Sequence, residues 1–248
     1  MYQFFVEPAQ INEEAKRVII LGSDVNHIRN VLRMRPGEEI SVSNGVDGKE
    51  YRCGILELKE TEILCELRFI KEEGTELPVR VTLFQGLPKS DKLELIIQKC
   101  VELGVTEIVP VATKRAVVKL DPKKAAGKGA RWQAIAEAAA KQSKRGIIPV
   151  VSPLMTFKEA VKKAADMDVC IIPYELAEDM TKTREILSGI SEGNQVAVFI
   201  GPEGGFDEKE IEEALVAGII PITLGKRILR TETAGMTVLS WLVYLLEK

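Results

Sequence analysis

The chain has 248 residues, of which 46% are hydrophobic and 29% charged, and its formal net charge is −3 at pH 7. These values are typical of an ordinary globular protein with a substantial core, in one large domain or two smaller ones. The longest apolar stretch, near residues 238–246, is too short to cross a bilayer, which excludes a membrane protein. The four cysteines are scattered and there is one histidine, so we expect reduced thiols in a cytoplasmic protein and no metal site.

The first 72 residues alternate short apolar runs with turn signals. Strands are predicted at residues 39–43, 51–56 and 63–69, because apolar runs there are bounded by turn residues. Asn44-Gly45 and Asp47-Gly48 separate the first two strands and are typical of tight hairpin turns. We therefore expect residues 1–72 to form a small β-barrel-like domain.

Residues 73–248 have a different pattern of predicted secondary structure, in which strands and helices alternate. This alternation predicts an α/β domain with an open, mostly parallel sheet and helices on both faces. The last helix is apolar almost all round, so it is predicted to be buried by its own domain or by a partner subunit. Strands are predicted at residues 79–85, 107–112, 169–173, 195–200 and 219–224, and helices at 90–103, 131–143, after Asp207 and at 232–246.

A glycine-rich loop at residues 201–205, Gly-Pro-Glu-Gly-Gly, joins a predicted strand to a predicted helix. Such loops often bind phosphate through free backbone N–H groups and the helix dipole. Here Asp207 and Glu210 have the spacing of a capping box, so they satisfy the first-turn donors themselves. Glu203 adds a carboxylate that would repel an anion. The loop is therefore predicted to bind a neutral or cationic ligand through backbone groups.

A second glycine-containing loop, residues 224–230, leads into the last helix, with Thr231 as the predicted N-cap. The carboxyl ends of parallel strands lie at one edge of the sheet, which is where open α/β sheets bind ligands. Either loop alone is typical of a tight connection, but two loops at one edge predict a shared ligand site.

The charge is unevenly distributed along the chain. Residues 114–145 contain ten basic residues against two acidic ones, although the chain as a whole is acidic. A local field of this kind attracts polyanions through the release of counterions. The segment is therefore a candidate surface for nucleic acid, and the alternative is a solvated, lysine-rich surface.

Two of these stretches, IGPEGGF at residues 200–206 and LGKRILRTETA at residues 224–234, resemble motifs of the SPOUT class of RNA methyltransferases. Within that class the chain resembles the small-subunit (16S) ribosomal RNA (uracil-N3)-methyltransferase family over nearly its whole length. Further matching stretches are HIRNVLRMRPGE at 27–38, KSDKLELIIQKCVELGV at 89–105, TKRAVVK at 113–119 and RWQAIAEAAAKQSKR at 131–145. One position departs from the pattern, since Lys141 precedes Gln142 where an acidic residue is expected.

The resemblance implies a fold and a set of partners. Residues 73–248 would form a SPOUT methyltransferase domain with a C-terminal trefoil knot, in whose loops S-adenosyl-L-methionine (SAM) is bound. Residues 1–72 would form a PUA-like β-barrel that grips RNA. The protein would be a homodimer acting on small-subunit ribosomal RNA or on the assembled small subunit.

The resemblance and the chemistry of SAM together assign the cofactor residues. SAM is a sulfonium cation, which suits a loop with Glu203 and no preference for phosphate. The family pattern implies that the cofactor contacts Pro173, Ile200, Gly201, Glu203, Gly204, Leu224, Ile228, Leu229, Thr233 and Ala234.

The acceptor chemistry points to charged residues beside the second loop. Uracil N3 attacks a methyl group well only when it is deprotonated, so the site needs a base and a group that stabilises the anion. Arg230 is the candidate stabiliser, and Glu232 or Glu203 is the candidate base. The alternative for Arg230 is a salt bridge to one of these glutamates that only braces the loops.

Basic residues outside the predicted cofactor site are the candidates for RNA contact. Trp132 either stacks on a base or anchors its helix in the core, and the turn around His27 either contacts phosphate or is an ordinary surface helix. Alternative functions are methylation of a ribose 2′-hydroxyl and a non-catalytic RNA-binding assembly factor. The predicted RNA-binding residues are Arg29, Arg33, Arg35, Arg115, Lys123, Lys124, Lys128 and Arg131.

Overall fold

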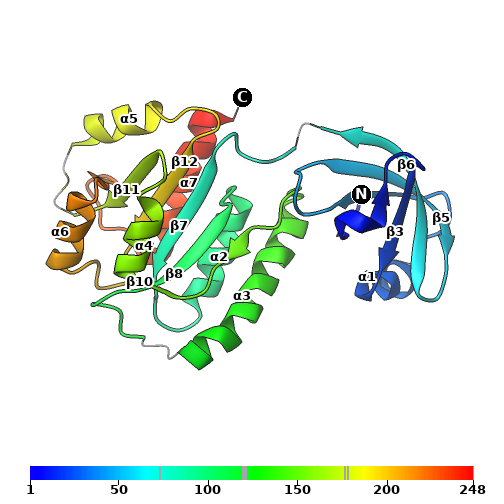
Figure 1. The fold of residues 1–248 in the computed structure, drawn as a ribbon, viewed down its shortest axis with the longest axis horizontal. Helices are drawn as coiled ribbons and strands as arrows, with labels where there is room; N and C mark the ends of the chain where they lie inside the picture. The colour runs from blue at the N-terminus through cyan, green and yellow to red at the C-terminus, as the bar shows by residue number, and fades with distance from the viewer. Residues whose placement is uncertain (73, 119–121, 176, 178, 248) are drawn as a thin grey trace. The chain divides into compact units, whose positions relative to one another are not determined.

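A computed structural model describes residues 1–72, 74–118, 122–175, 177 and 179–247. The chain divides into two compact units (Figure 1), which are described separately below. The first unit comprises Met1–Glu76 and Ala140–Ile148, and the second comprises Leu77–Ala139 and Pro149–Lys248. No helix among the described residues is long and apolar enough to span a membrane.

The first unit is a curled sheet of six strands in the order β1-β4-β5-β6-β3-β2. The three predicted strands are confirmed as β4, β5 and β6, and their inward side chains Ile40, Tyr51 and Ile63 are almost fully buried. The prediction missed the short strands β1, β2 and β3. The elements are β1 (Gln3–Phe5), a 3₁₀ turn (Pro8–Gln10), β2 (Ile11–Asn12), β3 (Arg17–Leu21), α1 (Ser23–Asn26), a π-helical turn (His27–Val31), β4 (Glu39–Ser43), β5 (Glu50–Leu58) and β6 (Glu62–Lys71).

The first unit also includes a segment from the middle of the chain, Ala140–Ile148. The first unit thus combines residues from two separate parts of the chain. The Arg145 side chain is buried and forms an ion pair with Glu76, whose Oε1 also accepts the backbone N–H of Gly146 at 3.1 Å. The backbone N–H of Ile148 donates to the Gly45 carbonyl at 3.1 Å. A buried charge is tolerated only when it is paired, so these contacts fix the segment to the sheet.

The second unit contains a seven-stranded sheet in the order β10-β8-β7-β12-β11-β13, with β9 paired to β8. Every strand pair in its described part is parallel. The strands are β7 (Arg80–Gly86), β8 (Glu107–Ala112), β9 (Val150–Val151), β10 (Met155–Thr156), β11 (Val169–Pro173), β12 (Gln195–Ile200) and β13 (Ile220–Ile222), and the helices are α2 (Lys92–Glu102), α3 (Pro122–Gln142), α4 (Phe157–Ala164), α5 (Met180–Ser188), α6 (Glu208–Val216) and α7 (Thr231–Leu246).

Helices cover both faces of this sheet, as predicted (Figure 1). On one face α2 and α7 pack together, and a Cβ atom at Gly235 of α7 would lie 3.6 Å from both Cys100 of α2 and Leu83 of β7. The next strand residue, Phe84, points to the opposite face, where it stacks on Phe199 with ring centroids 4.5 Å apart. That cluster belongs to the core beneath α4 and α6. The alternation of side chains along β7 thus separates the two layers.

Several predicted elements differ from the structure. Helices α4 and α5 were not predicted, and α3 begins nine residues earlier than the predicted 131. Its own domain buries only part of the last helix, because Val238 and Leu242 are fully buried while Tyr244 near its end is 86% exposed. Trp132 is buried in the core, as the second of its two interpretations required.

Candidate functional site

Three loops meet at one edge of the second unit's sheet, because the strands that precede them are parallel neighbours. The register pairs Ile171 of β11 with Val198 of β12, and Pro173 of β11 with Ile222 of β13. β11 therefore lies between the two strands whose glycine-containing loops were singled out in the sequence. Its last residue, Pro173, is half-buried at the same edge. The structure thus brings together the ends of β11, β12 and β13.

The loop after β12, residues 201–207 (the first loop), packs tightly against the end of β7. A Cβ atom at Gly86 would lie 2.8 Å from the Pro202 nitrogen, and one at Gly201 would lie 3.1 Å from the Gly205 backbone. Gly205 itself has φ of +66°, a conformation that favours glycine. Glycine at these positions therefore allows the loop to fold back on the strand ends.

The helix that follows this loop is capped by its own acids, as the sequence predicted. The Asp207 carboxylate accepts the backbone N–H of Lys209, and the backbone N–H of Asp207 donates to Glu210 Oε2 at 2.9 Å. Lys114 adds an ion pair to Asp207 at 2.9 Å and donates its backbone N–H to Glu210 Oε1 at 2.8 Å. The Lys114 ammonium holds the pKa of Asp207 below its usual value. These contacts occupy the place where a phosphate would bind a helix N-terminus.

Glu203 is also held by partners on the protein. Its two carboxylate oxygens lie 3.1 and 3.3 Å from the backbone nitrogen of Lys89, and Oε1 is 3.1 Å from Lys92 Nζ. Burial by itself would raise the pKa of Glu203, but the N–H groups of Glu203 and Lys89 and the Lys92 ammonium outweigh it and lower the pKa. A carboxylate stabilised in its charged form is a poor proton acceptor.

The loop after β13, residues 223–230 (the second loop), has few internal partners. Gly225 has φ of +103°, and its N–H donates to Thr223 Oγ1 at 3.2 Å. The Ile228 side chain is 93% exposed. Within the described part of the chain, no group accepts a hydrogen bond from the backbone N–H of Ile228 or Leu229. The loop therefore presents free backbone donors and an apolar surface to a ligand.

The predicted N-cap of the last helix was wrong by one residue. Arg230 occupies the cap position, and Thr231 is the first helical residue. The Thr231 hydroxyl instead donates to the Gly201 carbonyl at 2.6 Å and accepts from Gln85 Nε2 at 2.9 Å. The hydroxyl is used for a contact 30 residues away, because the loop after β12 lies beside the start of α7.

Charged residues gather where α7 begins. Lys92 Nζ, at the start of α2, lies 3.1 Å from Glu203 and 3.4 Å from Glu232 Oε2. Glu232 Oε2 is buried and has no hydrogen bond among the described residues, so its contact with Lys92 is an ion pair only. Arg230 is exposed and forms no ion pair within the described residues. The bracing salt bridge considered for Arg230 is instead made by Lys92.

Lys92 was missed by the sequence reasoning as a site residue. It lies within the stretch KSDKLELIIQKCVELGV, which carried part of the family resemblance, but nothing in its local pattern distinguishes it from a surface lysine. Only its proximity to two glutamates more than 100 residues away reveals it.

The other predicted cofactor residues lie around the same edge. Ile200 is buried at the end of β12, and Leu224 is half-buried at the start of the second loop. Thr233 is exposed and Ala234 is buried in the first turn of α7. Gly204 is covered on one side by Arg115, whose guanidinium donates to the Gly204 carbonyl at 3.4 Å. These positions are compatible with one site, and their contact with a cofactor stays a prediction.

The predicted RNA-binding residues are dispersed over both units. In the first unit Arg33 and Arg35 are exposed and Arg29 is half-buried. In the second unit Lys128 is exposed and Arg131 is paired with Glu94 at 2.8 Å. The side chains of Lys123 and Lys124 lie outside the described residues.

The density of free positive charge in residues 114–145 is lower than the sequence suggests. Arg145 is buried against Glu76. Lys141, the position that departs from the family pattern, lies 3.5 Å from Asp24 in the first unit. Both residues therefore help to hold residues 140–148 to the curled sheet, so they are not available as free cations for RNA.

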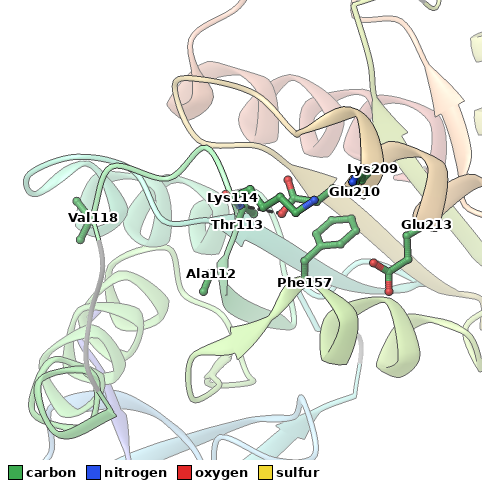
Figure 2. Close-up of a pocket in the computed structure, with 8 residues that line it drawn as sticks. All are labelled: Ala112, Thr113, Lys114, Val118, Phe157, Lys209, Glu210 and Glu213. Atoms are coloured by element: carbon green, nitrogen blue, oxygen red, sulfur yellow. Dashed lines mark hydrogen bonds between the residues drawn. The ribbon is translucent and has the colours of Figure 1, made fainter.

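A surface hollow of about 430 Å³ lies next to α4 and α6. Figure 2 shows Lys114, Glu210 and Phe157 among the side chains that surround it. This hollow is on the face covered by α4 and α6, whereas Arg230 precedes α7 on the opposite face. Lys114 and Glu210 are moreover already bonded to each other through the backbone. We therefore place the candidate site at the three loops rather than in the hollow.

The described residues show no metal centre, and three of the four cysteines are buried thiols. They contain no group of three or more His, Cys, Asp or Glu side chains that could hold an ion. Cys53, Cys65 and Cys100 are unpaired and buried, and burial raises the pKa of each thiol to about 12. Thiols with such pKa values are almost entirely protonated at neutral pH.

Comparison with known proteins relates both units to RNA methyltransferases. A family model described as an RNA methyltransferase domain matches residues 75–243, and one described as an RNA methyltransferase PUA domain matches residues 20–68. The Ribosomal RNA small subunit methyltransferase E of Bacillus subtilis (strain 168) is 38% identical over 251 residues, which cover 100% of this chain and 98% of that protein.

Solved structures give the same relationship. A crystal structure described as a hypothetical protein has a TM-score of 0.92 at 39% identity, covering 99% of this chain and 98% of its own. The Ribosomal RNA small subunit methyltransferase E from Neisseria gonorrhoeae, bound to S-adenosyl methionine, has a TM-score of 0.82 at 32% identity, with coverage of 99% and 98%. The similarity therefore extends over both units.

Proposed function

Since this chain belongs to the ribosomal RNA small subunit methyltransferase E family, we propose that it transfers a methyl group from SAM to N3 of a uridine in small-subunit (16S) ribosomal RNA. SAM-dependent methylation of this RNA is the activity of the family. The choice of uracil N3 as the acceptor rests on the motifs at residues 200–206 and 224–234. The observation that carries the proposal is that Arg230, at the edge where three loops meet, forms no ion pair among the described residues.

The residues at this edge fit SAM. The free backbone N–H groups of Ile228 and Leu229 can bind the adenine, and the exposed Ile228 side chain offers it an apolar surface. Glu203 and the acid-capped start of α6 give the first loop a negative character, which favours a sulfonium over a phosphate. When bound, SAM supplies an electrophilic methyl group whose carbon–sulfur electron pair stays on the sulfur after transfer.

Arg230 is the group that stabilises the acceptor. Removal of the N3 proton places negative charge on the uracil ring, and a guanidinium beside it lowers the energy of that charge. Since Arg230 is exposed and has no ion pair among the described residues, its charge is not neutralised by the protein. Arginine also keeps its proton at any working pH.

Glu232 is the better candidate for the base that takes the N3 proton. Lys92 lies near both carboxylates, at 3.4 Å from Glu232 and 3.1 Å from Glu203. Glu203 also accepts from the Lys89 backbone, whereas Glu232 Oε2 accepts no hydrogen bond from the described residues. The lowered pKa of Glu203 makes Glu203 a weak base. Lys92 then serves to orient both carboxylates.

Glu232→Gln should lower kcat about 100-fold, within the range for loss of a general base. The rate of that variant should rise with pH, because hydroxide then takes over removal of the N3 proton. Glu203→Gln is the matched control and should keep the wild-type pH profile. A larger loss of kcat in Glu203→Gln than in Glu232→Gln would reverse the assignment.

The remaining parts of the proposal follow the family resemblance. We expect a homodimer, a C-terminal trefoil knot and binding of RNA by the PUA-like unit. Exposed apolar side chains at Tyr244 and Leu245 of α7 are compatible with a subunit interface. Because the substrate is ribosomal, the proposal places the enzyme in the cytoplasm.

One assay tests the proposed function. Labelled SAM is incubated with the protein and either free 16S RNA or small subunits from a strain that lacks the gene, and the RNA is digested to nucleosides. N3-methyluridine is the expected product. A ribose-methylated nucleoside would show a different acceptor, and no transfer to either substrate would favour a non-catalytic RNA-binding factor.

A further inference from the structure

A chain of hydrogen bonds links the central strand of the sheet to the start of α7. Gln85, in β7, is fully buried, and its Nε2 donates to the Gly86 carbonyl at 3.0 Å and to Thr231 Oγ1 at 2.9 Å. The Thr231 hydroxyl uses its one hydrogen to donate to the Gly201 carbonyl at 2.6 Å. We call this chain of hydrogen bonds, from Gln85 through Thr231 to Gly201, the relay. The direction of each of its donors is fixed.

The relay lies inside the core rather than at the surface. Gln85 points to the face covered by α2 and α7, since it alternates with Phe84, which points to the opposite core. Thr231 is only 6% exposed. Buried polar side chains that are aligned in this way rigidify the groups that they join.

The side-chain oxygen of Gln85, Oε1, is buried and lacks a hydrogen-bond donor among the described residues. An unpaired buried acceptor costs free energy that an apolar side chain of similar size would not. A residue that is unfavourable for stability at this position indicates a role other than packing.

Thr231 directly follows Arg230 in the chain. The Arg230 side chain has no ion pair among the described residues. The backbone N–H groups of Thr233 and Ala234 both donate to the Arg230 carbonyl at 2.9 Å. The position of Arg230 therefore depends on how the first turn of α7 is attached to its surroundings. The hydroxyl of Thr231 attaches that turn to the first loop, through Gly201.

We propose that Gln85 and Thr231 are positioning residues for the methyl transfer, which set the first turn of α7 against the first loop and thereby aim Arg230 at the acceptor base. This inference rests on the proposed function, because it assumes that Arg230 acts on the substrate. Neither side chain touches the substrate, so both act through Arg230 and should affect turnover more than binding.

The test uses near-isosteric variants of the full-length protein. Thr231→Val removes the donor to Gly201, Gln85→Met removes the donor to Thr231 together with the orphaned oxygen, and Thr231→Ser keeps the hydroxyl. We expect kcat to fall at least 10-fold in Thr231→Val and Gln85→Met, because misplacement of about 1 Å at a reacting group costs up to about 100-fold. KM for SAM and for RNA should stay within about twofold of the wild-type values, and Thr231→Ser should retain wild-type kcat within about threefold.

A double-mutant cycle separates positioning from general structural damage. Since the relay acts through Arg230, Thr231→Val should lower kcat little further in an Arg230→Ala background. Full additivity of the two losses would overturn the inference. Calorimetry with S-adenosylhomocysteine verifies that each variant is folded. If Thr231→Val does not fold, the same cycle with Gln85→Met decides.

A measurement independent of activity completes the test. Amide hydrogen exchange at residues 231–235 should be faster in Gln85→Met than in the wild type, and unchanged exchange together with unchanged kcat would overturn the inference.

The two proposals fail in different ways. A wild-type enzyme that makes no N3-methyluridine contradicts the proposed function, whereas normal wild-type activity with fully active Thr231→Val and Gln85→Met contradicts only the relay.

Discussion

The first and second loops leave the same edge of the sheet and differ in how they are held. The acidic side chains of the first loop (201–207) are held by partners on the protein: Glu203 is bound by the Lys89 backbone and Lys92, and Asp207 by Lys114. In the second loop (223–230) the backbone N–H groups of Ile228 and Leu229 have no acceptor among the described residues. The first loop is therefore held in place by the protein. The second loop presents the groups that are available to a ligand.

This difference follows from the chemistry of the two stretches. The first loop leads into the capping box of Asp207 and Glu210. It packs against the end of β7, where Gly86 has no side chain to keep it away. The second loop carries Lys226, Arg227 and Arg230, all exposed, and no acid that could pair with them locally. Local composition thus decides which loop is closed and which stays available.

The largest expected effect comes from removing the free charge of the second loop. Arg230→Ala should lower kcat about 100- to 1000-fold, as does loss of a group that stabilises developing charge. RNA affinity should stay within about twofold, measured by filter binding. Arg227→Ala, in the same loop and equally exposed, is the matched control and should keep most of its turnover. Equal losses of turnover and affinity in Arg230→Ala would assign Arg230 to RNA binding.

The next effect is on stability and concerns the packing of the first loop against the end of β7. Gly86→Ala should destabilise the protein by about 3 kcal/mol, since its Cβ would collide with the Pro202 backbone and force the first loop to move. Gly225→Ala meets open space, so it should cost only about 1–2 kcal/mol for the positive φ. Urea unfolding of both variants gives the comparison. A greater loss in Gly225→Ala would mean that the second loop is the more rigid one.

Loss of the helix cap should have a smaller effect. Asp207→Ala is expected to lower the free energy of unfolding by about 1 kcal/mol. Thr156→Ala, which removes the cap of α4 (its hydroxyl accepts the N–H of Glu159 at 3.3 Å), should cost a similar amount. Only Asp207→Ala should weaken binding of S-adenosylhomocysteine in calorimetry, because only Asp207 borders the first loop. Equal weakening in both variants would contradict a local role for Asp207.

The smallest effect is on the pH dependence of stability. The pKa of Glu203 is lowered in the folded state, so its contribution is present above its ordinary value of 4.5 and is lost as pH falls below that value toward the folded pKa. Glu203→Gln should therefore flatten the fall of Tm on acidification in this range. A Tm profile identical to that of the wild type would show that the first loop does not hold Glu203 in its charged form.

Much of the second unit was predictable from the sequence. β11 and β12 match their predicted bounds, because buried strands of a parallel sheet are continuous apolar runs. The capping box of α6 was predictable because Asp207 and Glu210 contact each other within one helical turn. Local patterns of this kind need no knowledge of the rest of the fold.

The parts that could not be predicted depend on contacts between distant residues. The capping rule alone assigned Thr231 to the cap, but its hydroxyl is bonded to Gln85 across 146 positions and to Gly201 across 30. Lys92 gave no local signal, since its partners Glu203 and Glu232 come from other elements. Neither periodicity nor spacing encodes such pairings.

The segment Ala140–Ile148 has a consequence for dissecting the protein. It joins the first unit from the middle of the chain, because Arg145 forms an ion pair with Glu76 and the Ile148 N–H donates to the Gly45 carbonyl. A fragment cut after Glu76 would lose these contacts and leave the Glu76 carboxylate and the Gly45 carbonyl without their partners. The first unit should therefore be produced as a circularly rearranged or fused polypeptide that carries residues 140–148, and not as a simple N-terminal fragment.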